Sequence, residues 1–216
     1  MSASISKPKS KPKLVALTSP DSPRTEMFRA LKTNIEFADD RRERRIMAVT
    51  SAKPGEGKTV TIANLAVLYA QSGRRVLLVD ANLRKPDLHE VFMADNKTGL
   101  ADLLTGAAAF DYAVQELPVP NLSLLSAGRL AGPPSDLLGS ERMLDLLESL
   151  RARYDLVLLD TSAMLGVTDS QVLSAFCDGV VFVVRAGKVK QRDAMRAMEQ
   201  MDRVRAKVVG VVLNRA

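Results

Sequence analysis

A run rich in glycine and lysine carries the strongest chemical signal in the sequence. Ser51-Ala52-Lys53-Pro54-Gly55-Glu56-Gly57-Lys58-Thr59 lies between an apolar stretch and a helical pattern. Glycines let the backbone wrap around phosphate groups with its N–H groups pointing inward, Lys58 can reach the outer phosphates, and the Thr59 hydroxyl can bind Mg²⁺. We therefore predict a phosphate-cradling loop from Ala52 to Thr59 that binds ATP. Its predicted nucleotide-binding residues are Lys53, Pro54, Gly55, Glu56, Gly57, Lys58, Thr59 and Val60.

This loop departs at one position from the common phosphate-binding pattern. Ala52 replaces the first glycine of G-x-x-x-x-G-K-[ST], which weakens the bare motif match. A chance Gly-Lys-Thr in a surface turn is the alternative interpretation. The strand-like residues before the loop and the helical pattern after it favour nucleotide binding.

Two aspartates are candidates for holding a metal ion beside the phosphates. A triphosphate carries more negative charge than one lysine can offset, so a divalent cation and acidic ligands for it are expected. Asp80 follows the apolar run 76–79, and Asp160 follows the run 156–159. Either aspartate could simply cap the next turn, but sheets of this kind bind ligands at the carboxyl ends of their strands. We predict that Thr59, Asp80 and Asp160 bind Mg²⁺.

The elements that would position these residues alternate between short β-branched runs and longer amphipathic stretches. Expected strands are residues 46–51, 75–80, 122–126, 156–160, 180–185 and 208–213. Expected helices are residues 25–38, 58–72, 100–104, 135–154, 169–176 and 190–204, the fourth with Ser135 as its N-cap. Several strands are apolar on both faces, which suits burial between two helix layers. We predict an α/β fold of the P-loop NTPase type: a doubly wound, mainly parallel sheet with helices on both faces.

The size and composition fit one globular domain. The chain has 216 residues, of which 46% are hydrophobic, so it can bury a sizeable core. Four of its net +6 charges are alternating lysines in residues 7–13. We predict a flexible basic tail over residues 1–18, favoured over an anionic-lipid tether, and a P-loop ATP-binding domain over residues 19–216. The remaining charge is close to balanced, so no specific nucleic-acid partner is expected.

Composition also bounds the location and the chemistry. No apolar run approaches the roughly 18 residues that cross a bilayer, and the N-terminus lacks an apolar signal segment. We therefore expect a cytoplasmic protein. Cys177 is the sole cysteine and His89 the sole histidine, which argues against disulfide and zinc chemistry.

The ordered motifs resemble those of one known family, the bacterial tyrosine kinases of capsular and exopolysaccharide synthesis, of the cytoplasmic autokinase type. The resemblance runs from residue 19 to residue 214, almost the whole chain. It is carried by Ser22-Pro23, Thr33-Asn34-Ile35, Pro54-Gly55-Glu56-Gly57-Lys58-Thr59, Val79-Asp80, Leu83-Arg84-Lys85-Pro86, Gly99-Leu100, Gly132-Pro133-Pro134-Ser135-Asp136-Leu137-Leu138, Tyr154-Asp155, Asp160-Thr161, Val167-Thr168-Asp169 and Gly210-Val211-Val212-Leu213-Asn214.

The resemblance implies an ATP- and Mg²⁺-dependent protein-tyrosine kinase with a role for each motif residue. Lys58 and Thr59 would hold ATP and Mg²⁺, Asp160 would be the acid of the second Walker motif, and Asp80 would belong to a further Walker-like motif. Asp80 would orient or deprotonate the tyrosine hydroxyl, while Lys58 stabilises charge on the transferring phosphoryl group. Asn214 would lie near the adenine, although a turn-forming asparagine is the alternative.

The same resemblance implies partners. These are a membrane-embedded activator of polysaccharide export, which would recruit the chain to the inner face of the membrane, a protein tyrosine acceptor and further copies of the chain in a homo-oligomer. Glu26, Arg29 and Lys32 match a family pattern used for subunit contacts, with Lys32 where arginine is usual. A solvated helix face is an equally open interpretation of these three residues.

Three departures from the family pattern bear on catalysis. Asn82 stands where the family has a second acid, which would lower metal affinity or turnover, and Ser162-Ala163 replaces paired prolines, which would leave that loop less rigid. A C-terminal tyrosine cluster is missing, because the tyrosines are Tyr69, Tyr112 and Tyr154. Tyr69 and Tyr154 fall in helical patterns and are interpreted as packing residues. We expect no tail autophosphorylation, and an acceptor on another protein.

Two other functions stay open. A partition- or division-site ATPase, which dimerises around ATP, would use Lys53, because its spacing from Lys58 equals that of the extra lysine in those ATPases. The segment 83–86 and the N-terminal helix favour the kinase over this alternative. A catalytically weakened ATP-binding regulator is the other alternative, suggested by Asn82 and the missing tyrosine tail.

Overall fold

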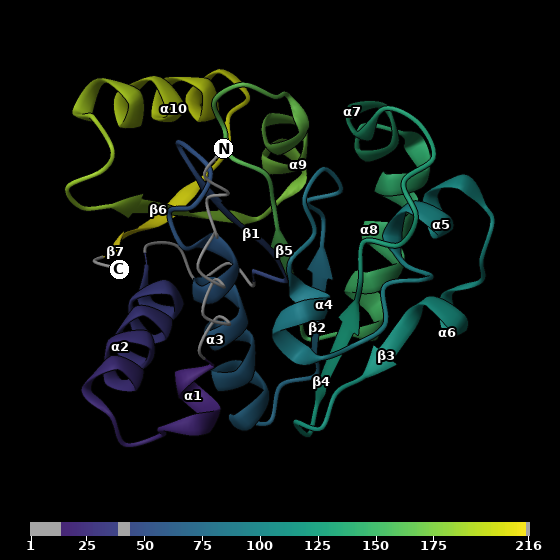
Figure 1. Ribbon diagram of the computed structural model, residues 1–216, viewed down its shortest axis with the longest axis horizontal. Coiled ribbons are helices and arrows are strands. Elements are labelled where there is room, and N and C mark those ends of the chain that lie inside the picture. Colours follow the sequence, from purple (N-terminus) through teal and green to yellow (C-terminus); the bar gives the residue numbers. More distant parts are fainter. Residues whose placement is uncertain (1–13, 39–43, 215–216) are drawn as a thin grey trace, which may run out of the picture.

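Residues 14–38 and 44–214 are described by the computed structural model, and they build a seven-stranded sheet between two layers of helices (Figure 1). The strands are β1 (Ile46–Ser51), β2 (Val76–Asp80), β3 (Val114–Glu116), β4 (Leu122–Leu125), β5 (Leu156–Asp160), β6 (Gly179–Arg185) and β7 (Val208–Asn214). Their spatial order is β3-β4-β2-β5-β1-β6-β7, with β3 antiparallel to β4 and every other neighbouring pair parallel. This is the predicted doubly wound α/β fold.

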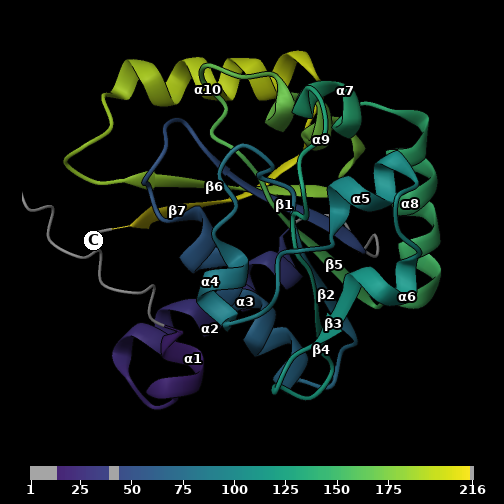
Figure 2. The same ribbon diagram turned by 45° about the vertical axis from the view of Figure 1, so that its right-hand side comes forward.

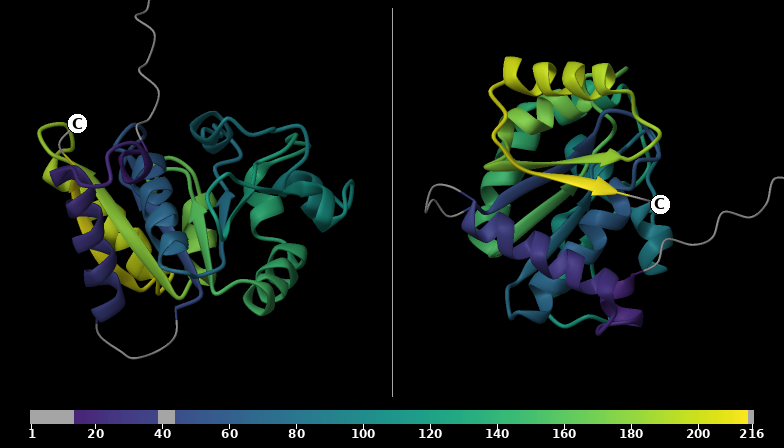
Figure 3. Two further views of the ribbon diagram at one scale, coloured as in Figure 1. Left: turned by 90° about the horizontal axis from the view of Figure 1, so that it is seen from below. Right: turned by 90° about the vertical axis from the view of Figure 1, so that its left-hand side faces the viewer.

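Two apolar clusters, one on each face of the sheet, define the helix layers (Figures 1 and 2). One face packs against α1 (Val15–Thr18), α2 (Pro23–Phe37), α3 (Lys58–Gln71) and α4 (Leu88–Phe92). The other packs against α5 (Leu100–Thr105), α6 (Phe110–Ala113), α7 (Pro134–Leu138), α8 (Glu141–Arg153), α9 (Asp169–Phe176) and α10 (Gln191–Arg203). Figure 3 shows α10 lying above β6 and β7 at one side of the molecule.

The strands that carry the predicted chemistry are neighbours at the centre of the sheet. Every residue of β1, β2 and β5 is buried, which explains why their sequences are apolar on both faces. In the parallel pairing of β2 and β5, Asp80 lies directly opposite Asp160. The loop after β1 opens beside β5, because β1 pairs with β5 on one side and β6 on the other. The strand order reverses here, because β2 lies on one side of β1 and β6 lies on the other. Folds of this type bind ligands at such a reversal.

A partly buried carboxylate, Asp178, joins three segments at the amino ends of β1 and β6. Asp178 accepts hydrogen bonds from the backbone N–H groups of Arg45 (2.9 Å) and Ile46 (2.8 Å), and from the Arg151 guanidinium at 2.8 Å to each oxygen. Burial alone would raise the pKa of Asp178, but the Arg151 contact and the two amides outweigh it and lower the pKa. The start of β1 and the end of α8 are therefore fixed to the loop before β6.

The six predicted strands are present, each with ends within one residue of the prediction. β3 was not predicted, because three residues at a sheet edge leave no apolar run to recognise. The short helices α1, α4 and α6 were also not predicted. Val15 and Ala16 of α1 are buried, so this part of the predicted flexible tail is structured. Residues 1–13 of the tail and 39–43 of the charged segment before β1 lie outside the described residues.

The helix predicted over residues 135–154 is two helices, and its predicted N-cap is wrong. α7 ends at Leu138, Gly139 follows it, and α8 begins after Ser140. Ser135 lies inside α7, whose N-cap position is Pro133 and makes no side-chain capping bond. Ser140 is the true cap, because its Oγ accepts a hydrogen bond from the Met143 N–H at 3.3 Å. The sequence does carry a signal for the break, because Gly139 is a common helix terminator and Ser140 a common N-cap residue.

The capping difference gives a matched pair of variants. Ser140→Ala removes the acceptor for an N-terminal amide of α8 and should lower the free energy of unfolding by about 0.5–2 kcal/mol. Ser135→Ala removes only an exposed contact to Asp136 and should change that free energy little. Urea denaturation followed by circular dichroism measures both. Equal losses in the two variants would contradict the assignment of the cap.

Candidate active site

The loop between β1 and α3 has the backbone that a phosphate cradle requires. Gly55 and Gly57 have φ values of 79° and 102°, in the left-handed region that residues with side chains rarely adopt. A Cβ at Gly57 would also collide with the side chain of Asn214. α3 begins immediately afterwards at Lys58, so its first N–H groups and its positive dipole end face the loop. This arrangement is suited to binding an anion.

Lys58 is a buried cation at the start of α3. The residue is 7% exposed, and its Nζ donates a hydrogen bond to Ser51 Oγ at 3.2 Å. Desolvation lowers the pKa of Lys58, while the negative charges of Asp160 and Glu56 act in the opposite direction. An ammonium group has three N–H donors, so donors remain for an anionic ligand.

Thr59 and Asp160 meet beside this lysine. The Thr59 hydroxyl donates a hydrogen bond to Asp160 Oδ2 at 2.6 Å. Asp160 is fully buried, and its Oδ1 has no hydrogen-bond partner within the described part of the chain. Burial raises the pKa of Asp160 to about 6, although the Thr59 hydrogen bond and the Lys58 charge oppose the change. An unpaired buried carboxylate oxygen is costly, so this site favours a cation.

Asp80 is the second buried carboxylate of the site. Its Oδ2 accepts hydrogen bonds from the N–H groups of Asp87 (3.1 Å) and Leu88 (3.0 Å), and its Oδ1 accepts one from Asn82 N–H at 3.3 Å. Burial raises the pKa of Asp80 well above its ordinary value, and the charge of Asp160 raises it further, while the three amides lower it. Oδ1 is the less occupied oxygen and the one available to a ligand.

These groups fit a magnesium ion beside a polyphosphate. A hydroxyl and two carboxylates are oxygen ligands, which Mg²⁺ prefers, and two carboxylates buried on paired strands repel each other unless a cation lies between them or a proton is bound. Within residues 14–38 and 44–214, His, Cys, Asp and Glu form no group of three that could hold a metal alone. Mg²⁺ in nucleotide sites takes its remaining ligands from phosphates and water, so such a group is not required.

The outer side of the phosphate loop is held by three contacts from the last third of the chain. Lys53 Nζ donates to Asp193 Oδ2 at 2.6 Å, at the start of α10. The Arg185 guanidinium donates to the Gly55 carbonyl at 3.2 Å. Asn214 Nδ2 donates to the Glu56 carbonyl at 2.9 Å, from the end of β7. The shape of the loop therefore depends on β6, α10 and β7 as well as on its own residues.

Glu56 turns its side chain back into the same loop. The residue is 2% exposed, and its Oε1 accepts a hydrogen bond from the Lys53 N–H at 2.6 Å. Burial raises the pKa of Glu56, against the lowering effects of amide hydrogen bonds and of the two loop lysines. A glutamate between two glycines thus closes the turn from inside and does not point to solvent.

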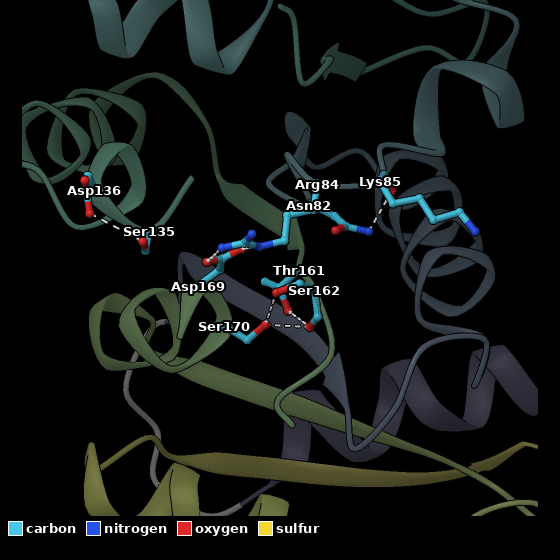
Figure 4. Close-up of polar contacts among 9 residues, drawn as sticks. All are labelled: Asn82, Arg84, Lys85, Ser135, Asp136, Thr161, Ser162, Asp169 and Ser170. Carbon is cyan, nitrogen blue, oxygen red and sulfur yellow. Dashed lines mark hydrogen bonds and ion pairs between the residues drawn. The ribbon is translucent and has the colours of Figure 1, made fainter. Parts of the chain in front are cut away.

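A second loop, between β2 and α4, is fastened to α9. Arg84 makes a two-point contact with Asp169, with Nε–Oδ2 at 2.7 Å and Nη2–Oδ1 at 3.0 Å (Figure 4). Asn82 Nδ2 donates to the Lys85 carbonyl at 2.7 Å, and Figure 4 shows the Lys85 side chain pointing away from this contact. Asn82 therefore closes a turn in the loop that follows Asp80, a role in which its amide donor is used.

The Ser162-Ala163 loop is held by hydrogen bonds. Thr161 Oγ1 donates to the Val49 carbonyl at 3.0 Å, and Thr50 Oγ1 donates to the Ser162 carbonyl at 3.0 Å. The hydroxyls of Ser162 and Ser170 lie 2.8 Å apart (Figure 4). The expected loss of rigidity without paired prolines stays a prediction, but buried hydroxyls connect this loop to β1 and α9.

Comparison with known proteins is consistent with this geometry. The family model of the AAA domain matches residues 44–209. The tyrosine-protein kinase YwqD of Bacillus subtilis is 40% identical over 201 residues, covering 93% of this chain and 85% of that protein. The solved kinase domain of the Escherichia coli tyrosine kinase ETK is 30% identical with a TM-score of 0.90, covering 99% of this chain and 84% of that one. This chain belongs to the bacterial tyrosine kinase family.

Relatives of this bacterial tyrosine kinase differ in length and in function. The chain spans 27% of the putative tyrosine-protein kinase EpsB of Ralstonia nicotianae, at 39% identity. The septum site-determining protein MinD of Pyrococcus horikoshii, solved with Mg-ADP, is 26% identical with a TM-score of 0.67, covering 79% of this chain and 70% of that one. The ATP-binding P-loop fold is therefore shared more widely than the kinase name.

The structure brings the predicted site residues of this bacterial tyrosine kinase together. Lys58, Thr59, Asp80 and Asp160 lie at the carboxyl ends of three adjacent strands, as predicted. Asn214 contacts the back of the phosphate loop, while its predicted position near adenine stays a prediction. Among residues 14–38 and 44–214, we find no helical segment with the length and hydropathy of a transmembrane span.

Other residues of the site were missed or only half recognised. Ser51 was named in the loop but not as the partner of Lys58, and Asp193 and Arg185 were not named as contacts of the loop. Asp193 lies 140 residues from Lys53, and nothing in the sequence links the two. In the N-terminal helix, Lys32 pairs with Glu36 at 3.2 Å and lies over the Tyr69 ring, which places part of the proposed subunit motif against its own chain.

Asp160→Asn should stabilise the protein without nucleotide. Folding raises the pKa of Asp160 from an ordinary 3.8 to about 6, so the folded state binds its proton more tightly than the unfolded state. That contribution to stability is complete below the unfolded pKa and is lost as pH rises through the folded pKa. The neutral variant should exceed the wild type by on the order of 1–3 kcal/mol at pH 7.5.

The measurement is urea denaturation of both proteins in the absence of magnesium. The difference between them should shrink at pH 4.5, where Asp160 holds a proton in the folded wild type. A variant that is less stable than the wild type at pH 7.5, or a difference independent of pH, would contradict the electrostatic account of this buried carboxylate.

Proposed function

We propose that this chain is an ATP- and Mg²⁺-dependent protein-tyrosine kinase of capsular or exopolysaccharide synthesis. The observation that carries the proposal is the convergence of Lys58, the Thr59–Asp160 contact and Asp80 beside a glycine loop with anion-binding geometry. Forty per cent identity to a tyrosine-protein kinase over 93% of the chain supports phosphoryl transfer to tyrosine.

Each residue has a defined task in this proposal. The loop amides and the start of α3 would bind the polyphosphate, and Lys58 would stabilise negative charge on the transferring phosphoryl group. Thr59, Asp160 and Asp80 would hold Mg²⁺, which supplies charge neutralisation and orientation of the phosphates when bound. Catalysis would then consist mainly of positioning and electrostatic stabilisation.

Asp80 would also act as the base. Oδ1 accepts one long amide hydrogen bond and is free to receive the proton of a tyrosine hydroxyl, while Oδ2 is held by two amides. The tyrosine oxygen would form a bond to the γ-phosphorus of ATP, the bond to ADP would break, and the proton would pass to Asp80.

The acceptor tyrosine would come from another protein. Tyr69 is 1% exposed beneath Lys32 and Arg74, and Tyr154 packs against the core, so both are packing residues as predicted. Tyr112 is 84% exposed but lies in α6, far along the sheet from the phosphate loop (Figure 1). A membrane-embedded activator, recruitment to the inner face of the membrane, and a homo-oligomer complete the proposal.

A dimerising ATPase is the second candidate. The MinD likeness and the spacing of Lys53 favour it. Against it, the Lys53 ammonium is bound to Asp193 of its own chain, and identity to a tyrosine-protein kinase is 40% compared with 26% to MinD. A weakened ATP-binding regulator would instead follow from Asn82, whose amide replaces a metal-binding carboxylate.

One assay separates the three functions. The protein is incubated with ATP, Mg²⁺ and a tyrosine-rich peptide, and phosphotyrosine and free phosphate are both measured. We expect phosphotyrosine, and a loss on the order of 100-fold in Lys58→Met and in Asp80→Ala, because each removes a charge that acts in the transition state.

Three outcomes are informative. Free phosphate without phosphotyrosine would favour the dimerising ATPase, and neither product would favour the regulator. Phosphotyrosine that persists in Asp80→Ala would contradict the assignment of Asp80 as the base but would still support kinase activity. Arg203→Gln, an exposed change at the far end of α10, serves as the control and should retain activity.

A further inference from the structure

The start of α10 makes an unusual contact with the phosphate loop. Asp193 is 5% exposed, yet its partner is the half-exposed side chain of Lys53, at 2.6 Å. A carboxylate this buried needs a counter-charge, and its place in the first turn of α10 lets the helix dipole favour its ionised form. Arg192 is a weaker second neighbour, at 3.8 Å. Lys53 is thus the principal charge partner of Asp193.

Lys53 is held at both ends by this arrangement. Its N–H donates to Glu56 Oε1 at 2.6 Å, and its ammonium donates to Asp193. Pro54 follows it, which disfavours the helical backbone conformation at Lys53. The first half of the phosphate loop is therefore held by two carboxylates, Glu56 within the loop and Asp193 on α10.

We propose that Asp193 is a positioning residue for nucleotide binding, acting through Lys53 to hold residues 53–56 in the phosphate-binding conformation. The inference rests on the proposed function, because it assigns the loop to the phosphates of ATP. Asp193 itself touches no reacting group. Its loss should weaken binding of the nucleotide and leave the chemical step intact.

The contact between Asp193 and Lys53 connects the position of α10 to the phosphate loop. α10 packs on the sheet through Ala197 and Met201, while Met195 and Met198 are exposed on its surface. A change in where α10 starts would move Asp193 and, with it, the entrance of the phosphate loop. Nucleotide affinity is coupled by this ion pair to an element 140 residues away along the chain.

The test is a double-mutant cycle on the binding of Mg-ADP, measured by calorimetry. Asp193→Asn should raise the dissociation constant about three- to ten-fold, the range expected for a hydrogen-bonded ion pair with one buried partner. The same substitution in a Lys53→Met background should cause little further change. Asp193→Glu should recover most of the affinity. Asp202→Asn removes an equal charge from an exposed position on the same helix and should have no effect.

Kinetics distinguish positioning from general damage. In the peptide assay, Asp193→Asn should raise KM for ATP several-fold with kcat at saturating ATP within about two-fold of wild type. A wild-type dissociation constant in Asp193→Asn would overturn the inference. So would an equal loss of affinity in the Lys53→Met background, because Asp193 would then act without Lys53.

Hydrogen exchange of the nucleotide-free protein tests the positioning role of Asp193 without depending on the proposed function. Asp193→Asn should speed exchange at the amides of Lys53, Gly55, Glu56 and Gly57, and Asp202→Asn should not. If the wild type bound no Mg-ADP, the proposed function would fail while this measurement still judged the ion pair. Unchanged exchange in Asp193→Asn would overturn the positioning role.

Discussion

Two carboxylates buried side by side are the constraint on which the rest of the site depends. Asp80 and Asp160 face each other across β2 and β5, and both are fully buried. Such a pair is unfavourable unless protons or a cation neutralise it. Thr59 and Lys58 supply part of the compensation through one hydrogen bond and one charge. The compensation is incomplete, because Asp160 Oδ1 has no hydrogen-bond partner among residues 14–38 and 44–214. A cation bound beside these two carboxylates would therefore stabilise the folded protein, and the proposed substrate brings a metal ion to this position.

The parallel pairing of β2 and β5 brings these two aspartates together. Parallel strands end at one edge, so carboxylates that terminate β2 and β5 come together without any contact between them in sequence. Complete burial of β1, β2 and β5 fixes the positions of their ends. Loops alone could not hold two aspartates buried side by side, because the buried loop backbones would need hydrogen-bond partners of their own.

The sequence predicts the parts of the site that are local and misses those that are not. Apolar runs located six strands to within one residue, and the order of Gly57, Lys58 and Thr59 placed the loop between strand and helix. The break at Gly139 was missed although it carries a local signal, because the Gly139-Ser140 pair was not interpreted as a helix end followed by an N-cap. Asp193 escaped because an aspartate in the first turn of a helix is common, and its partner lies far away in sequence.

Contacts between the phosphate loop and the end of the chain have a consequence during synthesis. Arg185, Asp193 and Asn214 all hold residues 53–56, and β6 forms one side of the β1 pairing. A ribosome that has released only the first 170 residues has exposed the glycine loop without its supports. The loop conformation of the folded domain therefore requires that residues up to Asn214 have been synthesised and have joined the sheet.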